Sequence, residues 1–376
     1  MLKRSQYSCI GVNKKLDRLA RDITFTHSIN LVTTLSNEHH NSILDRFCSL
    51  ILQRIQHNIQ CLTLDSLSVD RVLRIGNYSK LHKLSLVNLP IEMETVSNLK
   101  YFSLISFRET IEYDAKIVPL LRHMSKLEKL TLSLIVDRRN SFIDGHHLVN
   151  DILSKMSHLR IFIFNIITKR VIIDEEFLVT RDNILRPLIE KRCNAGCYTD
   201  YCTISDGQCH IFSLPFTLER MDVFTNKFPD SCLFMNVRHF AAGLIWRPFE
   251  HEFFAQISRA FPLLNKLEIH NILAQNKKIT YQQDGYEQTS IIEFPHLTVL
   301  DLSGSSLDYV KQFLFDFYTR LPSLNTLHVE YQLLLFATQY FTEDAARANC
   351  LKVKHIFFNR KPKTYPENFR DYFPLL

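Results

Sequence analysis

The sequence predicts an α/β solenoid, in which parallel strands line the concave face and helices line the convex face. Three observations lead to this prediction. A short segment from Leu297 to Leu307 has leucine at its first, fourth and sixth positions, followed by small polar residues. The same skeleton returns many times along the chain, and amphipathic stretches of helical spacing lie between its copies. Recurrence of one strand unit indicates repeats that each bury an apolar side against their neighbours.

The recurring skeleton matches the leucine-rich-repeat motif, whose three apolar side chains are expected to point from the strand into the core. It is lost between Phe164 and Leu218 and is most regular in the second half of the chain. The clearest copies are Ile59/Leu62/Leu64, Leu81/Leu84/Leu86, Leu99/Phe102/Leu104, Leu127/Leu130/Leu132, Leu159/Phe162/Phe164, Leu218/Met221/Val223, Val237/Phe240/Ala242, Leu264/Leu267/Ile269, Leu297/Leu300/Leu302, Leu324/Leu327/Val329 and Val353/Ile356/Phe358.

The intervals between skeletons predict the outer helices. Apolar residues recur there at spacings of three and four, which is typical of a helix that packs on one side. A short strand is expected before them, at residues 23–26. The expected helices cover residues 42–56, 114–124, 146–156, 183–192, 249–261 and 309–318.

These elements divide the chain into five expected parts. Residues 1–22 form a basic N-terminal helix or cap, and 23–169 hold the first group of repeats. Residues 170–213 form an irregular insertion with a cysteine cluster and a hairpin. The second group occupies 214–359, and the aromatic segment 360–376 caps the last repeat, whose open face is otherwise wet.

Composition limits the classes of function. The 45 basic and 39 acidic residues of the 376-residue chain leave a charge of +6, spread along the sequence. Nucleic-acid binding needs clustered positive charge, so the sequence disfavours that partner. No apolar run approaches the roughly 18 residues that a membrane helix needs, and no secretory signal is visible. We therefore expect a cytoplasmic or nuclear protein with reduced cysteines and no membrane partner.

Four of the nine cysteines, Cys193, Cys197, Cys202 and Cys209, lie in the expected insertion. Zinc sites usually contain closer cysteine pairs. Asp206-Gly207 is a two-residue hairpin signal, which would pair Ile204 with Cys209 and place both in the core. We therefore predict core cysteines and no metal, with a zinc-stabilised insertion as the alternative.

Catalytic motifs are absent from the sequence. His251-Glu252 begins like a metalloprotease helix, but alanine stands at 255 where the second histidine is required, so we expect His251 on the helix surface. The eight glycines form no phosphate-cradling loop. We predict no enzyme activity and no cofactor.

The candidate binding residues follow from strand geometry, because side chains alternate between the two faces of a strand. The third, fifth and seventh positions of each skeleton should form columns on the concave face. A protein partner would meet there a mixed-charge surface with its acids in the second half, whereas the alternative is that these charges only pair across strands. The third column contains Lys83, Lys129, Arg220, His239, Lys266 and His355, and the fifth contains Asp222, Glu268, Asp301 and His328.

The chain resembles the leucine-rich-repeat portion of F-box proteins, the substrate receptors of cullin-type ubiquitin ligases. The resemblance is clearest from Phe249 to Asn271 and from Phe294 to Leu335, and Gly11 to Leu19 looks like the end of the last F-box helix. The Leu-Pro-x-Glu-type opening of the F-box is not present ahead of these residues. The resemblance therefore implies substrate recognition more strongly than cullin-adaptor binding. On this interpretation, either the start of the sequence is truncated or the protein has lost its attachment to a ligase.

The function expected from the sequence is non-enzymatic protein recognition by a substrate-receptor-like repeat module. The alternative is a nucleic-acid-associated repeat protein with a zinc-stabilised insertion. One modest cluster of basic residues in the sequence favours this alternative. It lies near the end of the chain and contains Lys352, Lys354, Arg360, Lys361 and Lys363.

Overall fold

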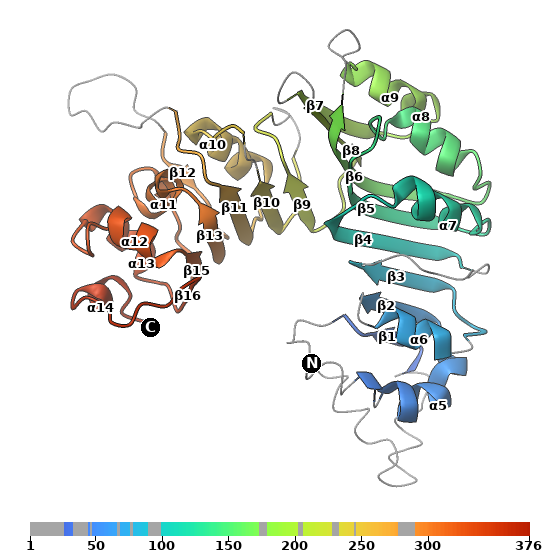
Figure 1. Cartoon of the computed structure of the whole chain (residues 1–376), viewed down its shortest axis with the longest axis horizontal. Coiled ribbons are helices and arrows are strands. Elements are labelled where there is room, and N and C mark those ends of the chain that lie inside the picture. The colour runs from blue at the N-terminus through green and yellow to red at the C-terminus, as the bar shows by residue number, and fades with distance from the viewer. Residues whose placement is uncertain are drawn as a thin grey trace. The chain divides into compact units, whose positions relative to one another are not determined.

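The computed structural model has a mixed α/β fold with a large, predominantly parallel sheet (Figure 1). It describes residues 26–32, 44–45, 47–65, 68–75, 78–88, 99–172, 179–201, 206–227, 233–243, 246–276 and 290–376. The chain forms two compact units, Met1–Ser213 and Leu214–Leu376. Each unit has its own sheet and its own helices.

The sheet of the first unit has eight strands in the order β1-β2-β3-β4-β5-β6-β8-β7. Strands β1 to β6 are parallel, whereas β8 lies antiparallel to both β6 and β7. The strands are β1 (Ser28–Asn30), β2 (Cys61–Asp65), β3 (Lys83–Val87), β4 (Tyr101–Thr110), β5 (Lys129–Asp137), β6 (Ile161–Ile172), β7 (Ala195–Tyr201) and β8 (Asp206–Ser213).

The repeated skeleton explains the register of these strands. Leu84 of β3 lies opposite Phe102 of β4, which lies opposite Leu130 of β5. These three side chains are buried in one hydrophobic core. Because each skeleton places its apolar residues at the same strand positions, parallel neighbours align apolar rows on one face and leave polar rows on the other.

Helices lie along the apolar side of this sheet (Figure 1). Their ends are stabilised locally: Asp144 accepts a hydrogen bond from the His147 amide at 3.0 Å, and Thr180 accepts one from the Asn183 amide. The segments are η1 (Phe47–Leu52), α5 (Gln53–Ile55), η2 (Gln56–Asn58), α6 (Val69–Ile75), η3 (Tyr113–Ile117), α7 (Val118–Arg122), α8 (Gly145–Leu148), η4 (Val149–Leu153) and α9 (Arg181–Glu190).

The second unit has a six-stranded, fully parallel sheet in the order β16-β15-β13-β11-β10-β9. A short parallel pair, β12 (Ile292–Glu293) and β14 (Thr319–Arg320), lies apart from it. The main strands are β9 (Arg220–Val223), β10 (His239–Gly243), β11 (Lys266–Asn271), β13 (Val299–Ser305), β15 (Thr326–Val329) and β16 (His355–Phe358).

Aromatic side chains dominate the core between this sheet and its helices. Phe254 lies edge-on to Tyr309 and Phe313, with ring centroids 5.9 and 4.9 Å away. Phe341 contacts Phe369 and Tyr372 of the C-terminal segment, where they are buried. The helices are α10 (His251–Ala260), α11 (Leu307–Leu314), α12 (Tyr331–Ala337), η6 (Asp344–Ala346), α13 (Arg347–Cys350) and α14 (Phe369–Tyr372).

The predicted two-residue turn at Asp206-Gly207 is wrong. Both residues lie inside β8, where Gly207 pairs with Val171 of β6 and Tyr201 of β7. Cys209 pairs with Thr199 on β7, and its expected partner Ile204 lies outside the described residues. Pairing along both edges of β8 satisfies more backbone groups than a tight turn would, so the sheet overrides the local turn signal.

Further expectations concern the N-terminal segment, the insertion and membrane crossing. The expected N-terminal helix lies outside the described residues, as does most of the expected strand at 23–26, and β1 is the first strand described. Segment 170–213 contributes α9, β7 and β8 to the first unit. Among the helices that the structure describes, none has the length and apolar character needed to cross a bilayer.

Candidate functional site

The polar face of the first sheet carries two straight rows of side chains. Lys83, Tyr101 and Lys129 face one another across β3, β4 and β5 in the third skeleton position. Ser85, Ser103 and Thr131 form the parallel row at the fifth position. The parallel register therefore places a row of hydroxyl groups beside a row with a lysine at each end.

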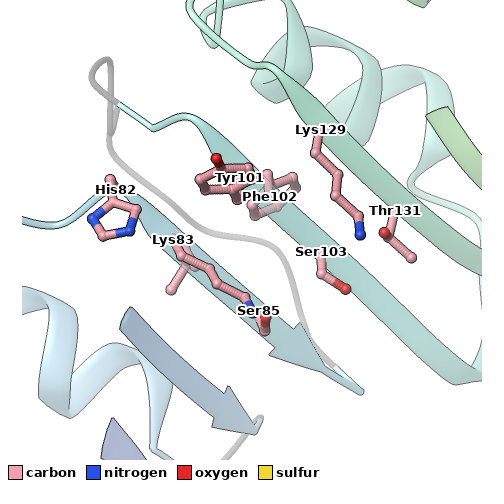
Figure 2. A pocket seen from close by; sticks show the side chains of 9 residues that line it. His82, Lys83, Ser85, Tyr101, Phe102, Ser103, Lys129 and Thr131 are labelled. Atoms are coloured by element: carbon pink, nitrogen blue, oxygen red, sulfur yellow. The ribbon is translucent and has the colours of Figure 1, made fainter. Parts of the chain in front are cut away.

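These two rows line a pocket of about 370 Å³ (Figure 2). The lysine stems run along the sheet, so the ammonium group of Lys83 ends near Ser85 and that of Lys129 ends near Thr131. Ser103 lies between them on the middle strand. His82 forms one wall, with its ring edge-on to Tyr101 at 5.9 Å between centroids.

Within the part of the chain that the structure describes, no carboxylate balances the charge of this pocket. Among the described residues, neither the Lys83 nor the Lys129 side chain forms an ion pair, and the three hydroxyl groups of the fifth-position row have no protein hydrogen-bond partner. The carboxylate of Glu128, the residue before Lys129, does not line the pocket and pairs with Lys100 at 2.8 Å. The pocket therefore offers positive charge and hydrogen-bond donors to an incoming group.

Sequence reasoning found the two lysines of this pocket but missed the other residues that line it. Tyr101 occupies the third position of its skeleton, and Ser85, Ser103 and Thr131 occupy the fifth position of theirs. The predicted columns contain only charged residues and histidines, whereas neutral hydrogen-bonding side chains occupy the same columns in β3, β4 and β5. Recording every residue type at those positions would have found them.

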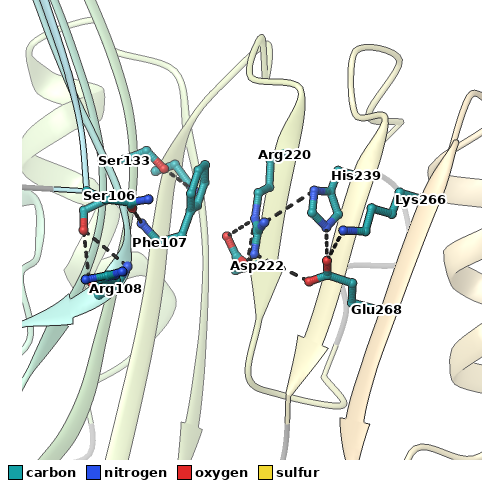
Figure 3. A network of polar contacts seen from close by, with 11 residues as sticks. Ser106, Phe107, Arg108, Ser133, Arg220, Asp222, His239, Lys266 and Glu268 are labelled. Carbon is teal, nitrogen blue, oxygen red and sulfur yellow. Dashed lines mark hydrogen bonds and ion pairs between the residues drawn. The ribbon is translucent and has the colours of Figure 1, made fainter. Parts of the chain in front are cut away.

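The corresponding face of the second unit carries a closed ionic network (Figure 3). Glu268 of β11 lies 2.5 Å from the Lys266 ammonium group and 3.0 Å from Nε2 of His239. Arg220 of β9 pairs with Asp222 at 2.7 Å and lies 3.7 Å from Glu268. The structure thus brings together five of the ten predicted binding residues, and their charges largely satisfy one another.

Glu268 holds the network together electrostatically. Burial alone would raise the pKa of its carboxyl, but hydrogen bonds from His239 and Lys266 and their positive charges more than offset this effect. The pKa of Glu268 therefore lies well below its ordinary range, and the carboxylate stays ionised at neutral pH. The network therefore presents little unpaired charge.

The remaining predicted residues lie further along the second sheet. Asp301 accepts hydrogen bonds from the amide and hydroxyl of Ser303 at 3.0 and 2.6 Å. His328 stacks on Phe357 with ring centroids 4.6 Å apart. His355 is exposed on β16, next to the half-buried Thr326 of β15. These three residues share the face with the network.

The cysteine cluster is part of the apolar core where the structure describes it. Cys209 is buried with Ile211, and Cys197 lies in the same core. Burial raises the pKa of the Cys197 thiol to about 11, so it is protonated at neutral pH. No three His, Cys, Asp or Glu side chains come together as metal ligands within the described residues, which do not include Cys202.

The expected surface position of His251 is wrong. Its ring is buried at the start of α10, where Nδ1 lies 3.1 Å from Oε1 of Gln312 and Nε2 lies 3.1 Å from the Ser290 carbonyl oxygen. The ring bridges α10, α11 and the segment before β12. A histidine at the first turn of a helix can serve as a polar link in the core when both nitrogens find partners.

Neither a protein-family model nor a curated protein matches this chain.

Proposed function

We propose that this chain is a non-enzymatic protein-recognition module built as a leucine-rich-repeat solenoid, in which the polar faces of its sheets contact a partner protein. The observation that carries this proposal is the strand register. In each sheet, the third and fifth skeleton positions line up across parallel neighbours on the face opposite the helices, and most of them carry polar side chains. Repeat proteins use extended surfaces of this kind to bind other macromolecules.

The side chains on these faces suit protein recognition better than a repetitive polyanion. The first unit presents lysines with tyrosine and hydroxyl groups, and the second presents acids and bases side by side. A mixed surface of this type favours a partner with its own specific charge pattern. Phosphate-backbone binding would need aligned positive charges, which the acids of the second unit oppose.

Attachment to a ubiquitin ligase is a narrower proposal. It rests on the resemblance to F-box repeat proteins, and its adaptor-contacting residues would include Gly11 to Leu19, outside the described residues. On this proposal, the repeat faces would bind a client protein and the N-terminal segment would bind a cullin adaptor.

Site-specific photocrosslinking tests the recognition proposal. A photoreactive phenylalanine analogue is placed at Thr63 or Thr326 on the polar faces, and at the exposed Lys155 or Arg259 on the helical sides as matched controls. After irradiation in native lysate, we expect the same partner protein to be crosslinked to both face positions. The yield of this crosslink should be at least tenfold higher than at the control positions.

The crosslinked products decide between the alternatives. Equal labelling from all four positions, or nucleic acid attached in place of protein, would overturn the recognition proposal. Zinc found with the nucleic acid would favour the metal-stabilised alternative. A client protein recovered together with the cullin adaptor would support the ligase proposal, and a client recovered without the adaptor would contradict it.

A further inference from the structure

We propose that the pocket between β3, β4 and β5 binds a phosphorylated side chain of the partner protein. This inference rests on the proposed protein-recognition function and specifies the chemistry of the group that enters one site. Its starting point is the pocket itself, in which Lys83 and Lys129 flank a row of hydroxyl groups.

The spacing of the two lysines suits a single anion. Their strands are separated by one intervening strand, so their Cα atoms are roughly 10 Å apart. Both stems extend toward the hydroxyl row, where Ser103 lies between the two ammonium groups (Figure 2). A group bound over Ser103 would therefore be within reach of both lysines.

Charge supports an anion as the occupant. Two ammonium groups in one pocket repel each other, and no described carboxylate offsets them. In the second unit, Lys266 occupies the same skeleton position and has Glu268 at 2.5 Å. The first unit keeps the cations at this position but has no acid at the fifth positions, where Ser85, Ser103 and Thr131 stand instead. A bound anion would supply the negative charge that Glu268 supplies in the other sheet.

The hydrogen-bonding groups favour phosphate over carboxylate. The pocket presents two ammonium groups and three hydroxyl groups that lack protein partners among the described residues. A phosphate monoester has three terminal oxygens, each of which accepts more than one hydrogen bond and which together carry a charge near −2. A carboxylate has two oxygens and one charge, and would leave more of these donors unused.

The size and walls of the pocket favour a side chain over a nucleotide strand. A volume of about 370 Å³ lies at the small end of the usual range for ligand sites, about 300–1,000 Å³. Tyr101 and His82 provide an aromatic wall against which the carbon atoms of a phosphorylated residue can pack. The ammonium groups of Lys83 and Lys129 converge on one point, whereas a nucleic-acid backbone needs positive charges spaced along its length.

The test uses the full chain and peptide libraries of random flanking sequence. Each library has a fixed central phosphoserine, phosphothreonine or phosphotyrosine, and a matched library carries the unphosphorylated residue. We expect at least one phosphorylated library to bind at least tenfold more tightly by fluorescence polarisation than its unphosphorylated counterpart. Lys83→Met/Lys129→Met should remove this difference, because methionine keeps the stem and deletes the charge.

Two matched variants show whether the effect belongs to the pocket. Lys155→Ala/Lys191→Ala removes two exposed lysines of the first unit that do not line the pocket, and should leave phosphopeptide binding unchanged. Lys83→Arg/Lys129→Arg keeps the charge and should retain most of the binding. Equal loss in the pocket variant and the exposed-lysine variant would mean general charge attraction and would overturn the proposal.

Other outcomes separate this inference from the recognition proposal. If inorganic phosphate binds as tightly as the best phosphopeptide, the pocket is a site for free anions. That result would overturn the proposal that the bound phosphate belongs to a protein side chain. Single-stranded RNA that binds more tightly than every peptide would also overturn it. If no library shows a phosphate-dependent difference while the crosslinks at Thr63 or Thr326 persist, phosphate recognition fails and protein recognition stands.

Discussion

Lysines occupy the same skeleton position in the two units, but their surroundings differ. Lys266 in the second sheet shares Glu268 with His239. Arg220 joins the same network 3.7 Å from Glu268 and also pairs with Asp222. Lys83 and Lys129 in the first sheet have serine and threonine at the neighbouring fifth positions and face a pocket. One sheet face thus satisfies its own charges, and the other keeps them available for a ligand.

This comparison shows that one repeat framework can support two kinds of surface. The apolar positions that hold the strands together are similar in both units, so the polar positions can vary with little effect on the fold. Charges that pair within the sheet contribute to stability, whereas unpaired charges are available for binding. Each of the following predictions tests one side of this difference.

The largest effects are expected in the core that both units share. Leu132 and Leu302 are completely buried at the sixth position of their skeletons. Leu132→Ala and Leu302→Ala should each lower the free energy of unfolding by about 2–5 kcal/mol, because a cavity replaces the lost side chain. Hydrogen exchange read by mass spectrometry should place each loss in the unit that carries the substitution. Equal loss in both units would instead show that they unfold as one.

Removal of the shared carboxylate should destabilise the second unit. Glu268 is 14% exposed in its side chain. Glu268→Gln leaves the surrounding cations unbalanced, so we expect a loss of about 2–4 kcal/mol at pH 7 in chemical denaturation. Glu128→Gln breaks only the surface pair with Lys100 in the first unit and should have a much smaller effect.

The effect of Glu268→Gln should depend on pH with a definite sign. The pKa of Glu268 is lower in the folded chain than in the unfolded chain, so its ionised form stabilises the fold above the unfolded pKa of about 4.3. That contribution is lost as the pH falls toward the folded pKa. The difference between wild type and variant should therefore shrink below about pH 4.5, and a constant difference would contradict this assignment.

The first unit should begin to lose stability at a higher pH than the second unit does, because a buried histidine must stay neutral in its folded state. Nε2 of His210 lies 2.6 Å from Oδ1 of Asn165, and burial lowers the pKa of His210 to about 3. Between about pH 6.5 and 3 the unfolded chain binds a proton that the folded chain does not, so the folded state loses about 1.4 kcal/mol per pH unit.

His210→Gln tests this source of acid sensitivity. Glutamine can keep a hydrogen bond to Asn165 but does not titrate in this range. Hydrogen exchange of β5 and β8, corrected for the intrinsic effect of pH, should show a flatter dependence in the variant. An unchanged slope would mean that another group causes the loss of stability.

The smallest effects should come from the lysines themselves. Lys83→Ala should change the free energy of unfolding by less than about 0.5 kcal/mol, because its ammonium group has no described protein partner. Lys266→Ala should cost more, about 1 kcal/mol, because it removes a partner of Glu268. Thermal melts of the two variants give this comparison directly, and equal losses would show that Lys83 also serves the fold.

Much of the architecture could be predicted from the positions of the leucines. Leu84, Leu130 and Leu300 are buried where the skeleton expects them, and Lys83 and Lys266 occupy the opposite face. The regular alternation along each strand makes these assignments possible from sequence alone. The same reasoning failed at Asp206-Gly207, where a strong local turn signal gave way to pairing on both sides of β8.

The candidate site was predictable only in part. Lys83 and Lys129 follow from skeleton counting, but the sequence does not show that Glu128 turns away to pair with Lys100. It likewise does not show that His251 is buried between Gln312 and Ser290, which are distant in the chain. The contacts of His251 depend on how α10 packs against α11 and the segment before β12, and spacing patterns carry no information about that packing.

The sequence by itself determined which side chains share a face of each strand, because the two-residue period of a strand is a local property of the backbone. Only the tertiary structure decided which charges meet across neighbouring strands. Glu268 reaches Arg220 and His239 through the register of β9, β10 and β11, whereas Lys83 and Lys129 meet hydroxyl groups across β3, β4 and β5. The strength of an electrostatic interaction depends on distance and burial, and both arise only when separate strands pack together.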